Sequence, residues 1–162
     1  MNPSGNASVD ALQEALKAEH AAVYGYGVVG ARLRGSLRRS AAMLWDAHRL
    51  QRDRLAAQIS RRGARPVAAA AAYRLPVRVT SARTAAQLAA ALEDGVLTAY
   101  AGLAGAPEAA LRTFAARAMQ EAAARSVRWR GGAGLPRTDG PAFPGLPPSA
   151  LSPKPRPGDG LG

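Results

Sequence analysis

Four ionisable side chains interrupt apolar helical stripes in this sequence, and their types are those that bind iron or manganese. Glu19, His48, Glu93 and Glu121 each lie on a different predicted helix. Each also lies about 12 to 15 residues from a predicted hairpin turn, so at ~1.5 Å rise per residue their depths agree within about 5 Å. The spacing therefore predicts that all four converge on one level, where carboxylates and imidazole could hold a metal ion.

A buried polar network is the alternative for the same four residues. A buried carboxylate is costly unless it is compensated. Arg52 follows His48 by four residues, and Arg125 follows Glu121 by four, a spacing that shares a helix face. A guanidinium can bridge carboxylates through paired hydrogen bonds. The network would join the four residues to Arg52, Arg125, Tyr26 and Tyr100, and we favour it over a metal site.

Helical periodicity runs through most of the chain. Alanine is abundant, only 5% of residues are aromatic, and β-branched residues are sparse, which favours packed helices over a sheet. We predict helices from about 8 to 34, 36 to 62, 81 to 105 and 107 to 131. Ser8, Ser36 and either Thr80 or Ser81 are the expected N-terminal caps, and Pro107 suits a first turn.

The lengths of the connections indicate how the helices are arranged. Two short turns join the first helix to the second and the third to the fourth, whereas residues 64–79 form a long connection. One long crossover between two helical hairpins is typical of ferritin-like folds. We predict an all-α, antiparallel four-helix bundle over residues 8–131. Residues 132–162 are rich in proline and glycine and are expected to be largely disordered, although 142–146 could dock on the bundle through Phe143 and Leu146.

Short motifs resemble those of known ferritin-like proteins. Glu19 and Tyr26 are seven residues apart, as are Glu93 and Tyr100, and this repeated pattern resembles the ferritin-like and rubrerythrin-like di-iron proteins. The segments 19–24, 48–53, 92–95 and 143–145 are similar to those of a ferritin-like domain family of unknown function. The resemblance implies a Glu-x-x-His pair on both the second and the fourth helix. Trp45 stands where the first of these pairs would have Glu, and Ala124 where the second would have His, so the implied di-iron site is degenerate.

Composition limits the remaining chemistry. The chain has no cysteine, which excludes disulfides, zinc–thiolate sites and thiol catalysis. The N-terminus lacks the pattern of a signal peptide, and no apolar run is long enough to span a bilayer, so we expect a cytoplasmic protein. The formal net charge of +11, almost all from arginine, would permit non-specific nucleic-acid binding.

Three functions remain open. The favoured one is a non-catalytic structural or interaction bundle without a cofactor. The second is a ferritin-like metal-binding protein or oxidase, with Fe or Mn held by Glu19, His48, Glu93 and Glu121. The third is a basic, nucleic-acid-associated helical protein. Partners under consideration are a second copy of the chain, another protein and nucleic acid through non-specific charge; a membrane is not expected.

Overall fold

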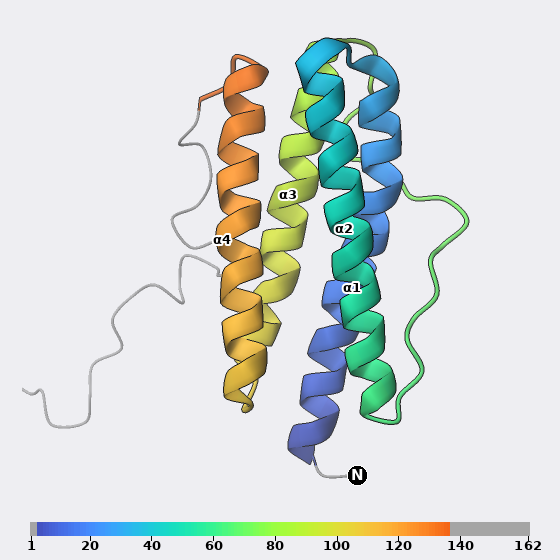
Figure 1. Ribbon diagram of the computed structural model, residues 1–162, viewed down its shortest axis with the longest axis vertical. Coiled ribbons are helices and arrows are strands. Elements are labelled where there is room, and N and C mark those ends of the chain that lie inside the picture. Colours follow the sequence, from blue (N-terminus) through green and yellow to red (C-terminus); the bar gives the residue numbers. More distant parts are fainter. Residues whose placement is uncertain (1–2, 137–162) are drawn as a thin grey trace, which may run out of the picture.

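Four long helices make up the computed structural model, which describes residues 3–136 (Figure 1). They are α1 (Pro3–Arg32), α2 (Gly35–Arg61), α3 (Ala82–Ala104) and α4 (Ala109–Gly132). The predicted number and order of helices are confirmed. The expectations for the tail from residue 137 onward, including docking of 142–146, lie outside the described residues. No described helix is long and apolar enough to cross a membrane.

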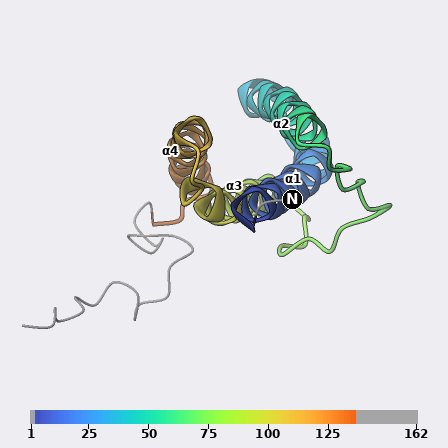
Figure 2. The same cartoon turned by 90° about the horizontal axis from the view of Figure 1, so that it is seen from below.

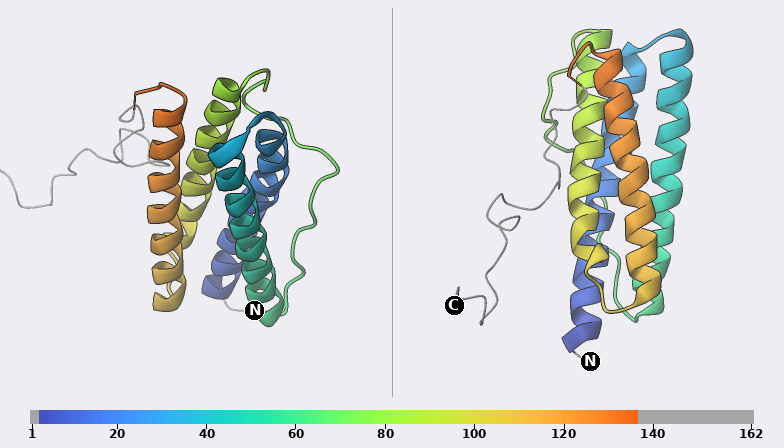
Figure 3. Two further views of the ribbon diagram at one scale, coloured as in Figure 1. Left: turned by 45° about the horizontal axis from the view of Figure 1, so that its top comes forward. Right: turned by 90° about the vertical axis from the view of Figure 1, so that its left-hand side faces the viewer.

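The connections give the chain a ferritin-like path. Short turns join α1 to α2 and α3 to α4, so each pair is an antiparallel hairpin (Figure 1). The segment from 62 to 81 runs along the outside of the bundle from the end of α2 to the start of α3, as the left-hand view of Figure 3 shows. Polar contacts hold it against α1, because the Gln13 amide donates to the Arg65 carbonyl and His20 Nε2 lies 3.1 Å from the Val67 carbonyl. The predicted crossover is therefore present.

The bundle is open along one side. α1 packs against α2 and α3, and α3 packs against α4, whereas in the described chain no Cα atom of α2 comes within 8 Å of one in α4. Seen along the helix axes, the four helices form an arc with α2 and α4 at its two ends (Figure 2). α2 and α4 are consequently the two helices of the arc that have a helical neighbour on one side only.

Two apolar clusters fill the bundle above and below a polar middle. One contains Leu16, Leu55 and Leu103, and the other contains Leu33 and Leu88. Many of the other buried positions are alanine, which lets the helices approach closely. Sequence periodicity predicted this core because apolar residues recur every three or four positions on α1, α2 and α3.

The helix ends differ from prediction in part. α1 begins at Pro3, so Ser8 is buried inside the helix and donates to Glu108 at 2.7 Å instead of capping. α2 begins at Gly35, so Ser36 is not its cap. Ser81 does cap α3, in a reciprocal capping box with Thr84. The error at Ser8 arises because a serine that satisfies a capping pattern can form a tertiary hydrogen bond instead.

The inward face of α4 was predicted incorrectly. The predicted stripe was Leu111, Phe114, Ala118, Glu121, Arg125 and Arg128; the structure buries Leu111, Ala115, Ala118, Ala122, Ser126 and Trp129. From residue 121 onward the two stripes differ by one residue, or about 100° of rotation. Alanine occurs on several faces of α4, so its periodicity does not determine its rotation, and packing against α3 decides it.

Candidate functional site

The polar middle of the bundle is built around His48. His48 extends from α2 between Glu19 of α1 and Glu93 of α3, and all three side chains are buried. Its Nδ1 lies 2.7 Å from Glu19 Oε2, and its Nε2 lies 3.2 Å from Glu93 Oε1. The structure therefore brings three of the four sequence-predicted residues into one hydrogen-bonded group.

Two buried tyrosines donate to the two carboxylates. Tyr100 Oη donates to Glu19 Oε1 at 2.8 Å, and Tyr26 Oη donates to Glu93 Oε1 at 2.6 Å. The sequence places both tyrosines in a network with the carboxylates but does not predict which glutamate each tyrosine bonds. α1 and α3 each carry a glutamate and a tyrosine seven residues apart on one face. The hydrogen bonds cross between the two helices, because the tyrosine of each helix bonds to the glutamate of the other.

Trp129 is a member of this group that sequence reasoning missed. It is buried near the end of α4, and its indole Nε1 donates to Tyr26 Oη at 2.9 Å. The predicted α4 stripe passed through Arg128, and no role was predicted for Trp129. A large aromatic in an alanine-rich helix was the available signal, since such residues dominate core energetics.

Electrostatics favour a protonated His48. Burial lowers the pKa of the imidazole, but hydrogen bonds to Glu19 and Glu93 and their negative charges outweigh this and raise the pKa to about 9. The Tyr26 ring stacks on the imidazole, with 5.1 Å between ring centroids. Burial and the nearby carboxylates raise the pKa of Tyr26 and Tyr100 as well, so both remain neutral donors.

Glu121 and Arg125 lie at the edge of this group. Glu121 has 63% of its side chain exposed and accepts a hydrogen bond from Arg125 Nη2 at 2.8 Å. Arg125 Nη1 lies 4.0 Å from Glu93 Oε2, which is buried and has no hydrogen-bond partner in the structure. Arg125 therefore faces both carboxylates.

Arg52 does not belong to the network, contrary to prediction. Its guanidinium pairs with the adjacent Asp53 at 2.7 Å. The four-residue spacing from His48 was correct for a shared helix side, but it did not determine where the long arginine side chain ends. The side chain of Gln51 on α2 instead acts on the group by lowering the pKa of Tyr100, against the larger opposing effects of burial and Glu19.

A cavity of about 150 Å³ connects the polar centre with the open side of the bundle. Its lining includes Glu19, His48, Gln51, Glu121 and Arg125. Glu121 thus shares a cavity with two residues of the buried group, although it lies at the rim. The two positions where the di-iron pattern would need further ligands lie elsewhere: Trp45 stacks under Arg49, and Ala124 is exposed. Among the described residues, no group of three or more His, Asp or Glu side chains was found that could hold a metal ion.

Known families and structures resemble this chain. A family model described as "Domain of unknown function (DUF4439)" matches residues 11–148. A crystal structure of the conserved hypothetical protein Rv2844 from Mycobacterium tuberculosis is 38% identical, with a TM-score of 0.76 over 79% of this chain and 98% of that one. None of the curated proteins matches.

A more distant structure has the same fold. It is described as ferritin-like, diiron-carboxylate proteins from Bacillus anthracis str. Ames, and it is 16% identical with a TM-score of 0.69. The match covers 82% of this chain and 99% of that one. The ferritin-like fold predicted from the sequence is confirmed.

Proposed function

Because the chain belongs to the family described as Domain of unknown function (DUF4439), we propose a function from its site. The protein is a non-catalytic, ferritin-like structural or interaction bundle. In it, a buried network of Glu19, His48, Glu93, Arg125 and the two tyrosines replaces a di-iron site. The network stabilises the middle of the bundle, where two carboxylates would otherwise be buried without compensation.

The engagement of both His48 ring nitrogens carries this proposal. A metal ion binds the lone pair of an unprotonated imidazole nitrogen. Here Nδ1 and Nε2 each contact a carboxylate oxygen, and the pKa of about 9 favours a proton on both nitrogens at neutral pH. His48 therefore acts as a cation between two anions, which is the charge that a metal would otherwise supply.

The donor set also argues against a pair of irons. The di-iron pattern requires a carboxylate three residues before His48 and an imidazole three residues after Glu121. Trp45 and Ala124 occupy these positions and offer no metal ligand. Arg125 brings a further positive charge to within 4.0 Å of Glu93, and this charge would repel a second cation. We infer that the residues present do not fit a di-iron centre.

A single Fe or Mn ion is the second candidate. The observation that favours it is the buried Glu93 Oε2, an acceptor without a hydrogen-bond partner in the structure. Glu19, His48 and Glu93, with Glu121 at the rim, would supply the ligands. Binding would require His48 to lose a proton and Arg125 to move, so metal uptake would increase with pH.

Metal loading separates the two candidates. The full chain would be incubated anaerobically with Fe(II) or Mn(II) at neutral pH, desalted and measured by mass spectrometry. We expect no retained metal, with the helical circular dichroism unchanged. Near-stoichiometric metal that is lost in Glu19→Ala and Glu93→Ala, and kept in the matched control Glu14→Ala, would refute our proposal. Glu14 is a suitable control because it lies on the same helix, exposed and paired with Lys17.

A further inference from the structure

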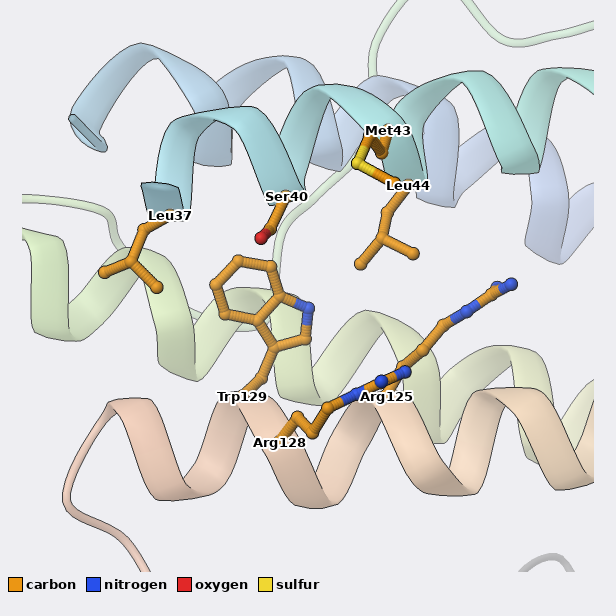
Figure 4. Close-up of a pocket in the computed structure, with 7 residues that line it drawn as sticks. All are labelled: Leu37, Ser40, Met43, Leu44, Arg125, Arg128 and Trp129. Carbon is orange, nitrogen blue, oxygen red and sulfur yellow. The ribbon is translucent and has the colours of Figure 1, made fainter. Parts of the chain in front are cut away.

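An apolar hollow opens at the α2–α4 side, above the polar centre. It has a volume of about 360 Å³, and its lining is Leu37, Ser40, Met43, Leu44, Arg125, Arg128 and Trp129. Figure 4 shows the α2 side chains on one side of this hollow and the Trp129 indole with the two arginines on the other. Leu37 is 41% exposed and Met43 is 72% exposed, so large apolar side chains border an open space.

The position of this hollow leaves it open to a covering segment. α2 and α4 are the two ends of the open arc in Figure 2, and within the described chain no Cα atom of one lies within 8 Å of a Cα atom of the other. Burying apolar surface is worth about 25 cal/mol for each Å² removed from water. Aromatic or aliphatic side chains that filled the hollow would therefore stabilise the bundle without moving either helix.

The C-terminal segment of the same chain is the occupant that the observations favour. The family match continues to residue 148, although the described structure ends at Pro136. The matched domain therefore includes residues that follow α4. Within this extension Phe143 and Leu146 are the large apolar residues, and they are the side chains that an apolar hollow would accept.

The distances allow the segment to reach the hollow. Trp129 lies four residues before Ala133, the C-terminal cap of α4, which corresponds to about 6 Å along the helix axis. Phe143 follows Pro136 by seven residues, and an extended chain of that length spans at most about 23–25 Å. The tail could therefore turn back over the end of α4 and place Phe143 beside Trp129.

Charge favours the tail over a second copy of the protein. Arg125 and Arg128 border the hollow. Residues 139–148 contain Asp139 and neither lysine nor arginine, so they bring no positive charge to these arginines. A second copy would present the same arginine-bordered face, in a chain whose formal net charge is already +11.

We propose that residues 142–146 cover this hollow, with Phe143 inserted between α2 and α4 against Trp129, Leu44 and Leu37. Arg125 and Trp129 border both the hollow and the polar network, but this inference does not depend on the proposed function, because the hollow accepts an apolar side chain whether or not the polar centre binds a metal.

Disulfide trapping tests the proposal cleanly, because the natural chain has no cysteine. Ser40→Cys places a thiol in the lining without removing an apolar side chain, and Ala142→Cys places the second beside an intact Phe143. The matched control pairs Ser40→Cys with Ala150→Cys, which lies beyond the family match. Both full-length double variants would be oxidised mildly at low protein concentration, and disulfide formation within the chain would be followed by mass spectrometry.

The expected difference exceeds what tail length alone produces. The quantity compared is the rate of disulfide formation in the Ser40→Cys, Ala142→Cys variant divided by the rate in the Ser40→Cys, Ala150→Cys variant. Loop-closure scaling alone gives a ratio of about four, because the spacer to residue 142 is shorter. Docking predicts a ratio above about ten, which falls to about four when Phe143→Ala is added. A ratio of fourfold or less, or a ratio unchanged by Phe143→Ala, would overturn the proposal. Faster formation of disulfides between chains would also overturn it and would assign the hollow to a second copy.

Discussion

Replacing His48 by glutamine should remove a pH-dependent part of the stability of this protein. In the folded state the pKa of His48 is raised from 6.5 to about 9. A raised pKa contributes stability that is complete below the unfolded value of 6.5 and is lost as the pH rises through 9. For a shift of this size the contribution falls by about 3 kcal/mol between pH 6 and pH 9.

Urea unfolding, followed by circular dichroism at several pH values, measures this loss. The wild-type protein should lose about 3 kcal/mol of unfolding free energy over this range. Most of this dependence of the unfolding free energy on pH should be absent in His48→Gln, because glutamine does not titrate. Groups elsewhere in the chain, such as the α-amino group, contribute equally to both proteins and cancel in the comparison. Equal slopes for the two proteins would refute the reasoning.

A direct titration keeps the test informative if the variant does not fold. The chain contains two histidines, His20 and His48, so the imidazole signals in a nuclear magnetic resonance spectrum are few and can be assigned with His20→Gln. The His48 signal should remain that of the imidazolium well above pH 7. Deprotonation of His48 below pH 7 would contradict the arrangement of one cation between two carboxylates.

Further predictions concern packing, hydrogen bonding and charge. Gly25→Ala should destabilise the protein by about 1–3 kcal/mol in urea unfolding, because an added Cβ would lie 2.5 Å from Leu92 Cδ1. The matched Gly27→Ala has open space and should instead stabilise it by about 0.5–1 kcal/mol; equal effects would contradict the close approach. Tyr26→Phe should cost about 1–3 kcal/mol by thermal unfolding, since it removes the donor to Glu93, and an unchanged melting temperature would count against the network. Nucleic-acid binding, measured by fluorescence anisotropy, should disappear by about 200 mM salt if it reflects charge alone, and persistence would indicate a specific site.

The sequence predicted the helices and most of the central polar group. Periodicity of three and four residues identified the inward faces of α1, α2 and α3, because apolar side chains alternate there with polar ones. Glu19, His48 and Glu93 stood out as charged residues on those faces. Their common depth followed from the hairpin lengths and the rise per residue. Tyr26 and Tyr100 stood out because each lies seven residues after a glutamate on the same helix face.

The sequence did not predict which face of α4 points inward. Alanine occupies several faces of this helix, so the periodicity of its apolar residues does not identify one buried face. As a result, Glu121 was expected on the buried face and Trp129 was not. The structure reverses the two, with Glu121 largely exposed and Trp129 buried against Tyr26. Arg52 was misassigned because helical spacing determines where a side chain begins but not where a long, flexible one ends.

Local patterns in the sequence by themselves determined the helices, their hairpins, the long crossover and the identities of the three central residues, because these depend on the order and spacing of side chains along one chain. Tertiary packing alone decided the rotation of α4, the pairing of each tyrosine with the glutamate of the neighbouring helix, and the open side between α2 and α4. These features depend on how close two helices approach, and that is determined by contacts between residues far apart in the sequence.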